Sequence, residues 1–167
     1  MTIRITAQII CDIIKYGMQL DDDQIWIYNQ RWEIPEDKRL YVVVGLMSAV
    51  PYGNTFRFST TDNKDQLYQY MKEMISVDLL SYTTEAQEKY SQILGSIMTT
   101  YSQQIQEAQA IKIYSTPMTI SDVSHVEGPA RLNRIAMTLQ VLRKYDMLAL
   151  TEYYDWITPG YIALAEK

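Results

Sequence analysis

The sequence contains one cysteine and one histidine among its 167 residues. The single cysteine, Cys11, excludes a disulfide within the chain and a Cys-rich metal site. The single histidine, His125, excludes zinc sites built from clustered histidines. Glycine and proline are also few, at 6 and 5, so the chain has no linker-like tract and no collagen-like repeat. These scarcities predict a protein without a bound metal, with its thiol reduced as in the cytoplasm.

The sequence also lacks long apolar runs and an excess of positive charge. No run approaches the roughly 20 apolar residues of a membrane span. The N-terminal stretch has no small-residue cleavage site, and Asp12 and Lys15 interrupt it, so we expect no signal peptide. Fifteen basic and twenty acidic side chains give a net charge of −5. This balance argues against a general nucleic-acid binder and against an anionic membrane as partner.

What the sequence does have is enough apolar residues for one core, and many tyrosines. Hydrophobic residues make up 47% and charged residues 21% of the chain, which is typical of a folded domain. Fourteen tyrosines stand against two phenylalanines. Because tyrosine is enriched at protein–protein interfaces, this bias indicates contacts with other proteins.

The N-terminal half begins with a helix pattern and continues with strand patterns. A stripe of isoleucines predicts a helix over about residues 2–18. Apolar or alternating runs predict strands at 25–28, 40–46 and 55–61. Pro51, Gly53 and Asn54 separate the last two runs, so we expect a turn there.

The C-terminal half contains the clearest helix pattern of the chain. Apolar residues recur at helical spacing from Ala86 to Ile105, and Thr84 to Gln87 has the form of a capping box. A helix of about 22 residues would be about 33 Å long and would lie across a whole sheet face. Alternating patterns predict strands at about 75–80, 111–114 and 132–145.

This order of elements predicts an α+β fold. We expect a mainly antiparallel β-sheet with one long helix packed on it and an N-terminal helix. Residues 1–147 would form a single domain, and residues 148–167 an aromatic C-terminal tail or arm.

The sequence contains none of the common catalytic motifs. There is no GxGxxG, no P-loop and no GxSxG elbow. His125 has Ser121, Asp122 and Ser124 nearby, but alternating residues of a strand point to opposite faces. We therefore expect no enzyme, no catalytic residue and no cofactor, and an enzyme using the His125 region is the last of our hypotheses.

The charges are distributed unevenly along the chain. A basic stretch and an acidic stretch indicate head-to-tail assembly, in which one subunit's basic patch meets the next subunit's acidic patch. The same charges also fit ordinary surface scatter. Reversing Arg134 and Arg143 to Glu should weaken assembly and leave the monomer folded. The basic residues are Arg131, Arg134, Arg143 and Lys144, and the acidic loop contains Asp21, Asp22 and Asp23. That loop lacks the spacing of an EF-hand, so we expect a solvated loop and no metal site.

The C-terminal tail carries four large aromatic residues within nine positions. They either fold back on the core of their own subunit or dock on a neighbour. The residues are Tyr153, Tyr154, Trp156 and Tyr161, and we count the first three as candidate interface residues.

Three stretches of the sequence resemble the bacteriophage neck and tail-terminator (tail-completion) family. They are Met74–Ser81 (MISVDLLS), Ser124–Val141 (SHVEGPARLNRIAMTLQV) and Glu152–Asp155 (EYYD). The run Leu40–Leu46, after a proline-containing loop, fits an early buried strand of that family. The Trp-Ile-Thr-Pro-Gly segment after Asp155 has no counterpart in the resemblance.

The resemblance implies a structural virion protein of the neck or tail end, assembled in the host cytoplasm. Such proteins form a hexameric ring on the last ring of the tail tube and offer their other face to the head connector. The implied partners are other copies of this chain, the tail-tube protein and a head-completion protein. DNA would pass through the ring without specific binding, and the family has no catalytic residues. Net negative charge agrees with such a ring, with Asp21–Asp23 as candidates for the lumen.

Two other readings remain open from the sequence. Another head–tail completion protein would show the same residues. A small adaptor that binds one protein partner would explain the tyrosines equally well. Neither reading requires a cofactor or a membrane.

Overall fold

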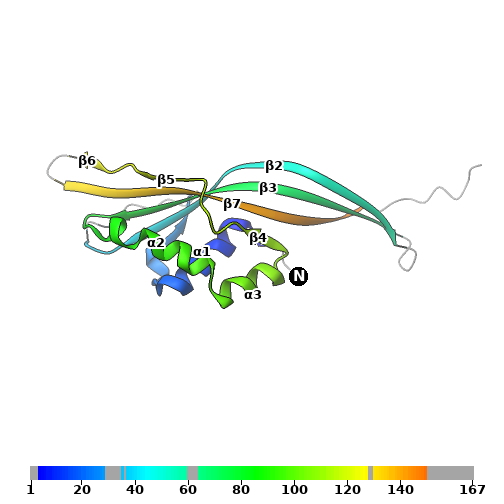
Figure 1. Ribbon diagram of the computed structural model, residues 1–167, viewed down its shortest axis with the longest axis horizontal. Helices are drawn as coiled ribbons and strands as arrows, with labels where there is room; N and C mark the ends of the chain where they lie inside the picture. The colour runs from blue at the N-terminus through cyan, green and yellow to red at the C-terminus, as the bar shows by residue number, and fades with distance from the viewer. Residues whose placement is uncertain (1–3, 29–34, 36, 60–63, 128–129, 150–167) are drawn as a thin grey trace, which may run out of the picture.

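The computed structural model describes residues 4–28, 35, 37–59, 64–127 and 130–149. The described part has three α-helices, one short 3-10 helix and seven strands, most of them joined in one sheet (Figure 1). The expected mixed fold, dominated by a sheet and opened by an N-terminal helix, is confirmed. The elements are α1 Thr6–Met18, η1 Asp22–Gln24, β1 Ile25–Ile27, β2 Tyr41–Ser59, β3 Lys64–Ser81, α2 Glu85–Ile97, α3 Thr100–Ala108, β4 Ile111–Ile113, β5 Thr119–Asp122, β6 His125–Glu127 and β7 Ala130–Ala149.

Three long strands form the centre of the sheet. The order is β1-β2-β3-β7-β4, and the pairings of β2 with β3 and of β3 with β7 are antiparallel. Strand β1 pairs in parallel with β2 at residues 42–44. Strands β4, β5 and β6 follow one another along the edge of β7 that faces away from β3 (Figure 1). Strand β7 is therefore an interior strand over most of its length.

The main core lies between one face of this sheet and the helices. The predicted isoleucine stripe of α1 is fully buried against alternate residues of the long strands, and α1 and α2 cover the same face (Figure 1). Burying each such aliphatic side chain contributes about 1.5–3 kcal/mol. The fully buried residues include Ile9, Ile10, Ile13, Ile14, Val42, Val44, Ile75, Val77, Leu79, Leu139 and Val141.

The predicted single long helix is wrong, because two helices occupy its place. Thr99 has an extended backbone (φ −68°, ψ 155°), and its hydroxyl accepts a hydrogen bond of 3.2 Å from the N–H of Ser102. Thr99 thus caps α3 and ends the preceding helical path, as a hydroxyl side chain commonly does. The predicted capping box at Thr84 is also wrong. The Thr84 hydroxyl donates to Glu88 instead, at 2.6 Å.

The predicted turn at Pro51 and Gly53 is wrong as well. Strand β2 continues through both residues, and its register with β3 shifts between Leu46 and Ser48 and between Pro51 and Gly53. Each shift accommodates an extra residue as a β-bulge. Among the described strands, β2 is an edge strand at this point, and proline, which has no N–H to donate to a ladder, is tolerated in edge strands.

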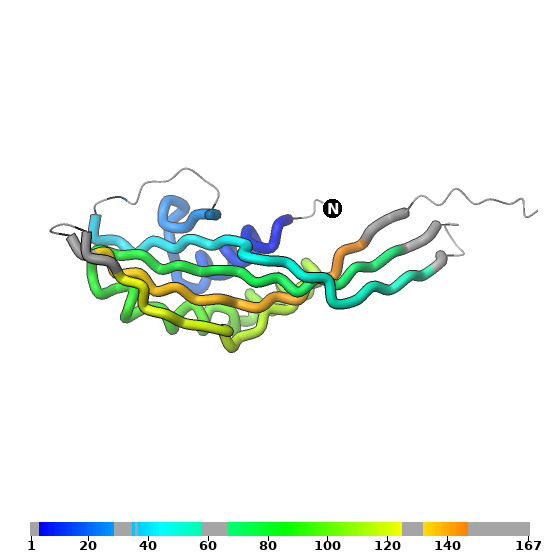
Figure 2. The backbone as a smooth tube through the Cα atoms, turned by 90° about the horizontal axis from the view of Figure 1, so that it is seen from above, coloured from blue at the N-terminus to red at the C-terminus, as the bar shows by residue number. Residues whose placement is uncertain are grey.

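The long strands extend beyond the helices. We call this extension the arm and define it as residues 50–59 of β2, 64–72 of β3 and 142–149 of β7, which are aligned by the pairs Val50↔Lys72 and Lys72↔Leu142. Figures 1 and 2 show the three strands projecting past α3 with no described helix on either face. Residues 46–57 of β2 are all exposed. The sheet therefore has a covered end and an uncovered end.

Helices α1 and α2 approach each other closely at Gly17. A Cβ atom at this position would lie 2.2 Å from the Cβ and 2.9 Å from the Cα of Ser96, which is buried in α2. Real Cβ atoms do not come this close, so the helix crossing requires glycine at position 17. Gly95, in the next helix, faces open space.

We expect the substitution Gly17→Ala to destabilise the protein by about 1–3 kcal/mol, because the added methyl group overpacks the helix crossing. Gly95→Ala is the matched control. It should leave stability unchanged or raise it by up to about 1 kcal/mol, since alanine is the better helix former. Urea unfolding of both variants measures the difference. Equal effects of the two substitutions would contradict the close approach.

Candidate functional site

The predicted basic residues of β7 do not form one patch. Successive residues of a strand point to opposite faces, so Arg143 lies on the helix side of the sheet, and Arg134 and Lys144 lie on the other side. The ten positions between Arg134 and Lys144 correspond to about 33 Å along the strand. Arg131 pairs with Val126 of β6 through its backbone, and its side chain lies outside the described part of the structure.

Arg134 forms an ion pair within its own subunit. Its Nη2 atom lies 3.0 Å from Oδ2 of Asp78 on β3, and Asp78 is 4% exposed. Breaking a pair in which one carboxylate is this deeply buried leaves an uncompensated charge. Arg134 is therefore part of the fold of the sheet, and about a third of its side chain remains available at the surface.

Arg143 is buried where the arm meets the helical layer. It is 4% exposed, and its guanidinium donates to the Thr6 hydroxyl at 2.8 Å and to the Arg4 carbonyl at 2.5 Å. The same guanidinium lies 4.7 Å from the ring centre of Tyr145. Our expectation that Arg143 contacts a partner is therefore wrong for the folded subunit, because the N-terminal residues already cover it. Reversing Arg134 and Arg143 to Glu would destabilise the subunit, which corrects our expectation that this double variant leaves the monomer folded.

Tyr145 connects this arginine to a buried glutamate. Its hydroxyl donates to Oε1 of Glu73 at 2.6 Å, and Glu73 is 3% exposed. Burial, and next the hydrogen bond to Glu73, raise the pKa of Tyr145. We call Thr6, Glu73, Arg143 and Tyr145 the junction cluster. It closes the core at the row of the sheet where the arm begins.

Lys144 lies on the opposite face, at the base of the arm. Its Nζ atom is 3.6 Å from the ring centre of Tyr68 and 3.7 Å from a carboxylate oxygen of Asp146. The aliphatic stem thus covers an aromatic ring while the amino group stays at the surface. Of the four predicted basic residues, Lys144 and Arg134 are those whose described side chains reach the surface.

The three consecutive aspartates lie at the 3-10 helix η1, and two of them are paired with basic residues. Asp22 accepts a hydrogen bond from Lys15, and this contact is the main cause that raises the pKa of that lysine. Asp23 lies 2.9 Å from Arg39. Asp21 precedes η1, and its N–H donates to Oε1 of Gln24 at 3.0 Å. These ion pairs are exposed, so each contributes little stability.

Cys11 and His125 belong to different elements, α1 and β6. Cys11 is buried in α1, and burial together with the neighbouring Asp12 raises the pKa of its thiol to about 12. The thiol is therefore protonated at neutral pH and is a poor nucleophile. His125 pairs with Leu132 through the backbone of β6. Its side chain lies outside the described residues, as do the candidate interface residues Tyr153, Tyr154 and Trp156.

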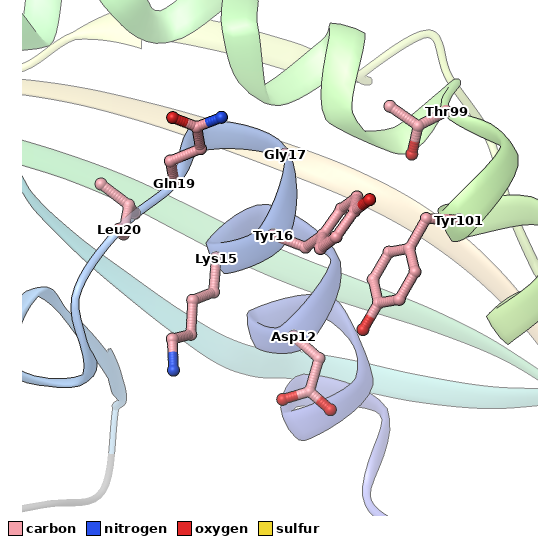
Figure 3. A pocket seen from close by; sticks show the side chains of 8 residues that line it. All are labelled: Asp12, Lys15, Tyr16, Gly17, Gln19, Leu20, Thr99 and Tyr101. Atoms are coloured by element: carbon pink, nitrogen blue, oxygen red, sulfur yellow. The ribbon is translucent and has the colours of Figure 1, made fainter.

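A shallow cleft of about 650 Å³ lies between the end of α1 and the start of α3 (Figure 3). Its most prominent feature is the stack of Tyr16 on Tyr101, with ring centres 3.9 Å apart. The two charged residues that line it, Asp12 and Lys15, are paired with Arg4 and Asp22. The cleft therefore offers an aromatic surface and no acid–base pair.

Other chemical features can be stated only for the part of the chain that the structure describes. There, no three His, Cys, Asp or Glu side chains gather as metal ligands, and no helix is long and apolar enough to cross a membrane.

The feature that sequence reasoning missed is the uncovered part of β2. Its exposed apolar side chains belong to Leu46, Met47, Val50, Tyr52 and Phe56, which are between 54% and 64% exposed. Contiguous exposed apolar residues on a strand are unusual for a monomer and mark interaction surfaces. The alternation of Phe56 with Arg57 was visible in the sequence, but the assumed turn concealed the continuity of the strand.

No protein-family model matches the chain, and no curated protein matches it.

We expect Arg143→Met to lower the free energy of unfolding by about 2–4 kcal/mol, because the Thr6 hydroxyl and the Arg4 carbonyl lose their buried donor. Lys144→Met, at the adjacent position, should change stability by less than about 1 kcal/mol. Chemical denaturation of both variants tests this. A stable Arg143→Met protein that fails only in assembly would restore the original interface prediction.

Proposed function

We propose that this protein is a structural virion component, a tail-terminator or neck ring that caps a phage tail tube and joins the tail to the head connector. Copies of the chain form a ring, hexameric in the family that the sequence resembles. The tail-tube protein and a head-completion protein are its partners. It catalyses no reaction, and its mechanism is geometric: it binds the tube end, blocks the surface on which the tube grows and presents a new surface to the head.

The observation that carries this proposal is the uncovered arm. Beyond the junction cluster, no described helix covers either face of this three-stranded sheet, and small sheets need packing on at least one face. Val50, Tyr52 and Phe56 place apolar side chains on this solvent-exposed surface. A subunit with such an arm is suited to a state in which a neighbouring molecule covers it.

The charges support a ring around DNA. The net charge of −5 gives a bore that repels phosphate, so DNA can move through it without being held. The loop at Asp21–Asp23 is the proposed lumen or inter-subunit segment, although its ion pairs with Lys15 and Arg39 reduce its local charge. The surface part of Arg134, Lys144 and the aromatic tail with Tyr153, Tyr154 and Trp156 are the proposed contacts to neighbours.

An adaptor that binds a single protein partner is the second candidate. The arm favours it to the same degree, because one partner could cover the exposed strand as well as a ring neighbour could. Mass in solution separates the two candidates. A monomer that ignores tail tubes would support the adaptor.

We expect phage particles that lack this protein to have tails of unregulated length that are not attached to heads. The reason is that nothing then blocks the growing end of the tube or presents a surface to the head. Electron microscopy of such particles provides the measurement. Normal tails joined to heads would refute the proposal.

A variant of the arm should separate assembly from folding. Val50→Asp combined with Phe56→Asp removes two apolar contacts of about 1.5 kcal/mol each, which predicts roughly hundredfold weaker association. The helical core is remote from both residues, so thermal unfolding should change little. Met98→Asp is the control, since Met98 is 65% exposed on the helix side. Equal incorporation of both variants into particles would remove the arm from the argument.

A further inference from the structure

The sheet has an open, uncharged edge on β2. Strand β1 pairs with residues 42–44, and the N–H of Tyr28 donates to the Val44 carbonyl at 2.9 Å. From residue 45 onward, no strand among the described residues pairs with the outer side of β2. The segment 46–50 contains no charge and no proline, and three of its side chains are more than half exposed. Charged residues and proline usually protect the edge strands of natural proteins from pairing with other chains, and this segment has neither.

A second open edge lies on the other side of the sheet, at β5. This strand pairs with β7 on one side, all four of its residues are exposed, and its outer side meets no other described strand. Residues 118–121 carry no charge. Met118 and Ile120 expose 55% and 43% of their surface. This edge therefore has the same chemistry as the β2 edge.

The two edges lie at the same level of the sheet. Gly45 is the register partner of Ser76, and Ser76 is the partner of Thr138. Thr138 is in turn the partner of Thr119 in β5. One transverse row thus connects the start of the open β2 edge to the open β5 edge. In an unshifted contact, Gly45 of one copy would lie opposite Thr119 of the next, so pairing Leu46 with Ile120 displaces successive copies by two residues along the strands.

From this arrangement we infer that the β2 edge of one copy pairs with the β5 edge of the next. Three antiparallel pairings separate the two strands, so β5 is antiparallel to β2, and copies in the same orientation join by an ordinary antiparallel ladder. Because the two edges differ, the contact is head to tail and can repeat until a ring closes. The inference deepens the proposed ring by naming its subunit interface, and it rests on that proposed function.

The register of this contact follows from the side-chain faces. The backbone groups of Val44 point outward to β1, so those of Leu46, two residues later, point outward as well. Leu46 lies opposite Ile75 and Ile120 opposite Met137, and both partners are buried on the helix side. The N–H of Val123 donates to Arg134 of β7 and that of Met118 to Thr138, which leaves Ile120 as the outward-facing residue of β5 on this face. Residues that pair directly in a ladder share a face, so we place Leu46 of one copy opposite Ile120 of the next.

A cysteine pair tests the contact in the full-length protein. We expect Leu46→Cys combined with Ile120→Cys to form disulfides between copies under mild oxidation at high protein concentration, giving a ladder of oligomers on a non-reducing gel. Within one chain, three strand spacings of about 14 Å separate the two positions, which exceeds disulfide reach. Leu46→Cys with Met98→Cys is the control and should give no ladder. The native Cys11 is buried and common to both variants.

Other outcomes would overturn the inference. No cross-linking beyond the control would refute the contact. A dimer formed by Leu46→Cys alone, without a ladder, would replace it by a symmetric pairing of two β2 edges. A pair of introduced opposite charges gives an independent check by light scattering. Leu46→Lys and Ile120→Glu alone should each reduce assembly at least tenfold, and the variant with both substitutions should recover assembly. Failure of the double variant to recover would also count against the register.

The virion proposal and this contact fail separately. A cross-linked ladder from a protein whose absence leaves tails normal would keep the contact and reject the virion role. Tails of unregulated length in the absence of the protein, together with a lack of cross-links, would keep the virion role and reject the contact between the β2 and β5 edges.

Discussion

The rest of the structure depends on a mismatch between the lengths of its strands and its helices. Strands β2, β3 and β7 have 19, 18 and 20 residues, whereas α1 and α2 have 13 each. At about 3.3 Å per strand residue and 1.5 Å per helix residue, the sheet is about 60 Å long and each helix about 20 Å. The helices can cover only part of the sheet. An apolar core therefore fills one end, and no described helix covers the other end.

The junction cluster lies where these two regimes meet. On the side of the junction cluster that α1 and α2 cover, alternate strand residues are aliphatic and fully buried. On the side of the arm, the described strand residues are exposed or half-buried. Glu73 and Arg143 end the core with polar groups that are bonded within the subunit, through Tyr145, Thr6 and the Arg4 carbonyl. Such partners offset the cost of burying polar groups, whereas the second carboxylate oxygen of Glu73, Oε2, is buried without a hydrogen-bond partner among the described residues. Arg4 and Thr6, near the N-terminus, therefore belong to the base of the arm together with β7.

Sequence periodicity was sufficient for those elements whose pattern reflects burial. The isoleucine stripe of α1, the run at 40–46 and the alternation of β7 were predicted because each has one face in the core. The predictions failed where the outcome depends on the neighbours of a residue in the sheet. Pro51 signals a turn locally, yet an edge strand accepts it, and Thr99 ends a helix whose apolar spacing continues. Likewise, the basic residues of β7 are close in sequence but alternate between faces, and the burial of Arg143 depends on α1, 137 positions away. The open edges are a property of strand order, which no local pattern contains.

The polar bonds at the base of the arm have a mechanical consequence. Hydrogen bonds are directional, whereas apolar packing is not. The three hydrogen bonds of the junction cluster therefore restrict the angle between the arm and the helical layer more narrowly than apolar contacts of the same area would. The arm beyond it is about 30 Å long, so that a tilt of one degree at the base displaces the tip by about 0.5 Å. The hydrogen bonds of Arg143 and Glu73 therefore hold the direction of the arm, and loosening them would displace the tip of the arm more than any other part of the protein.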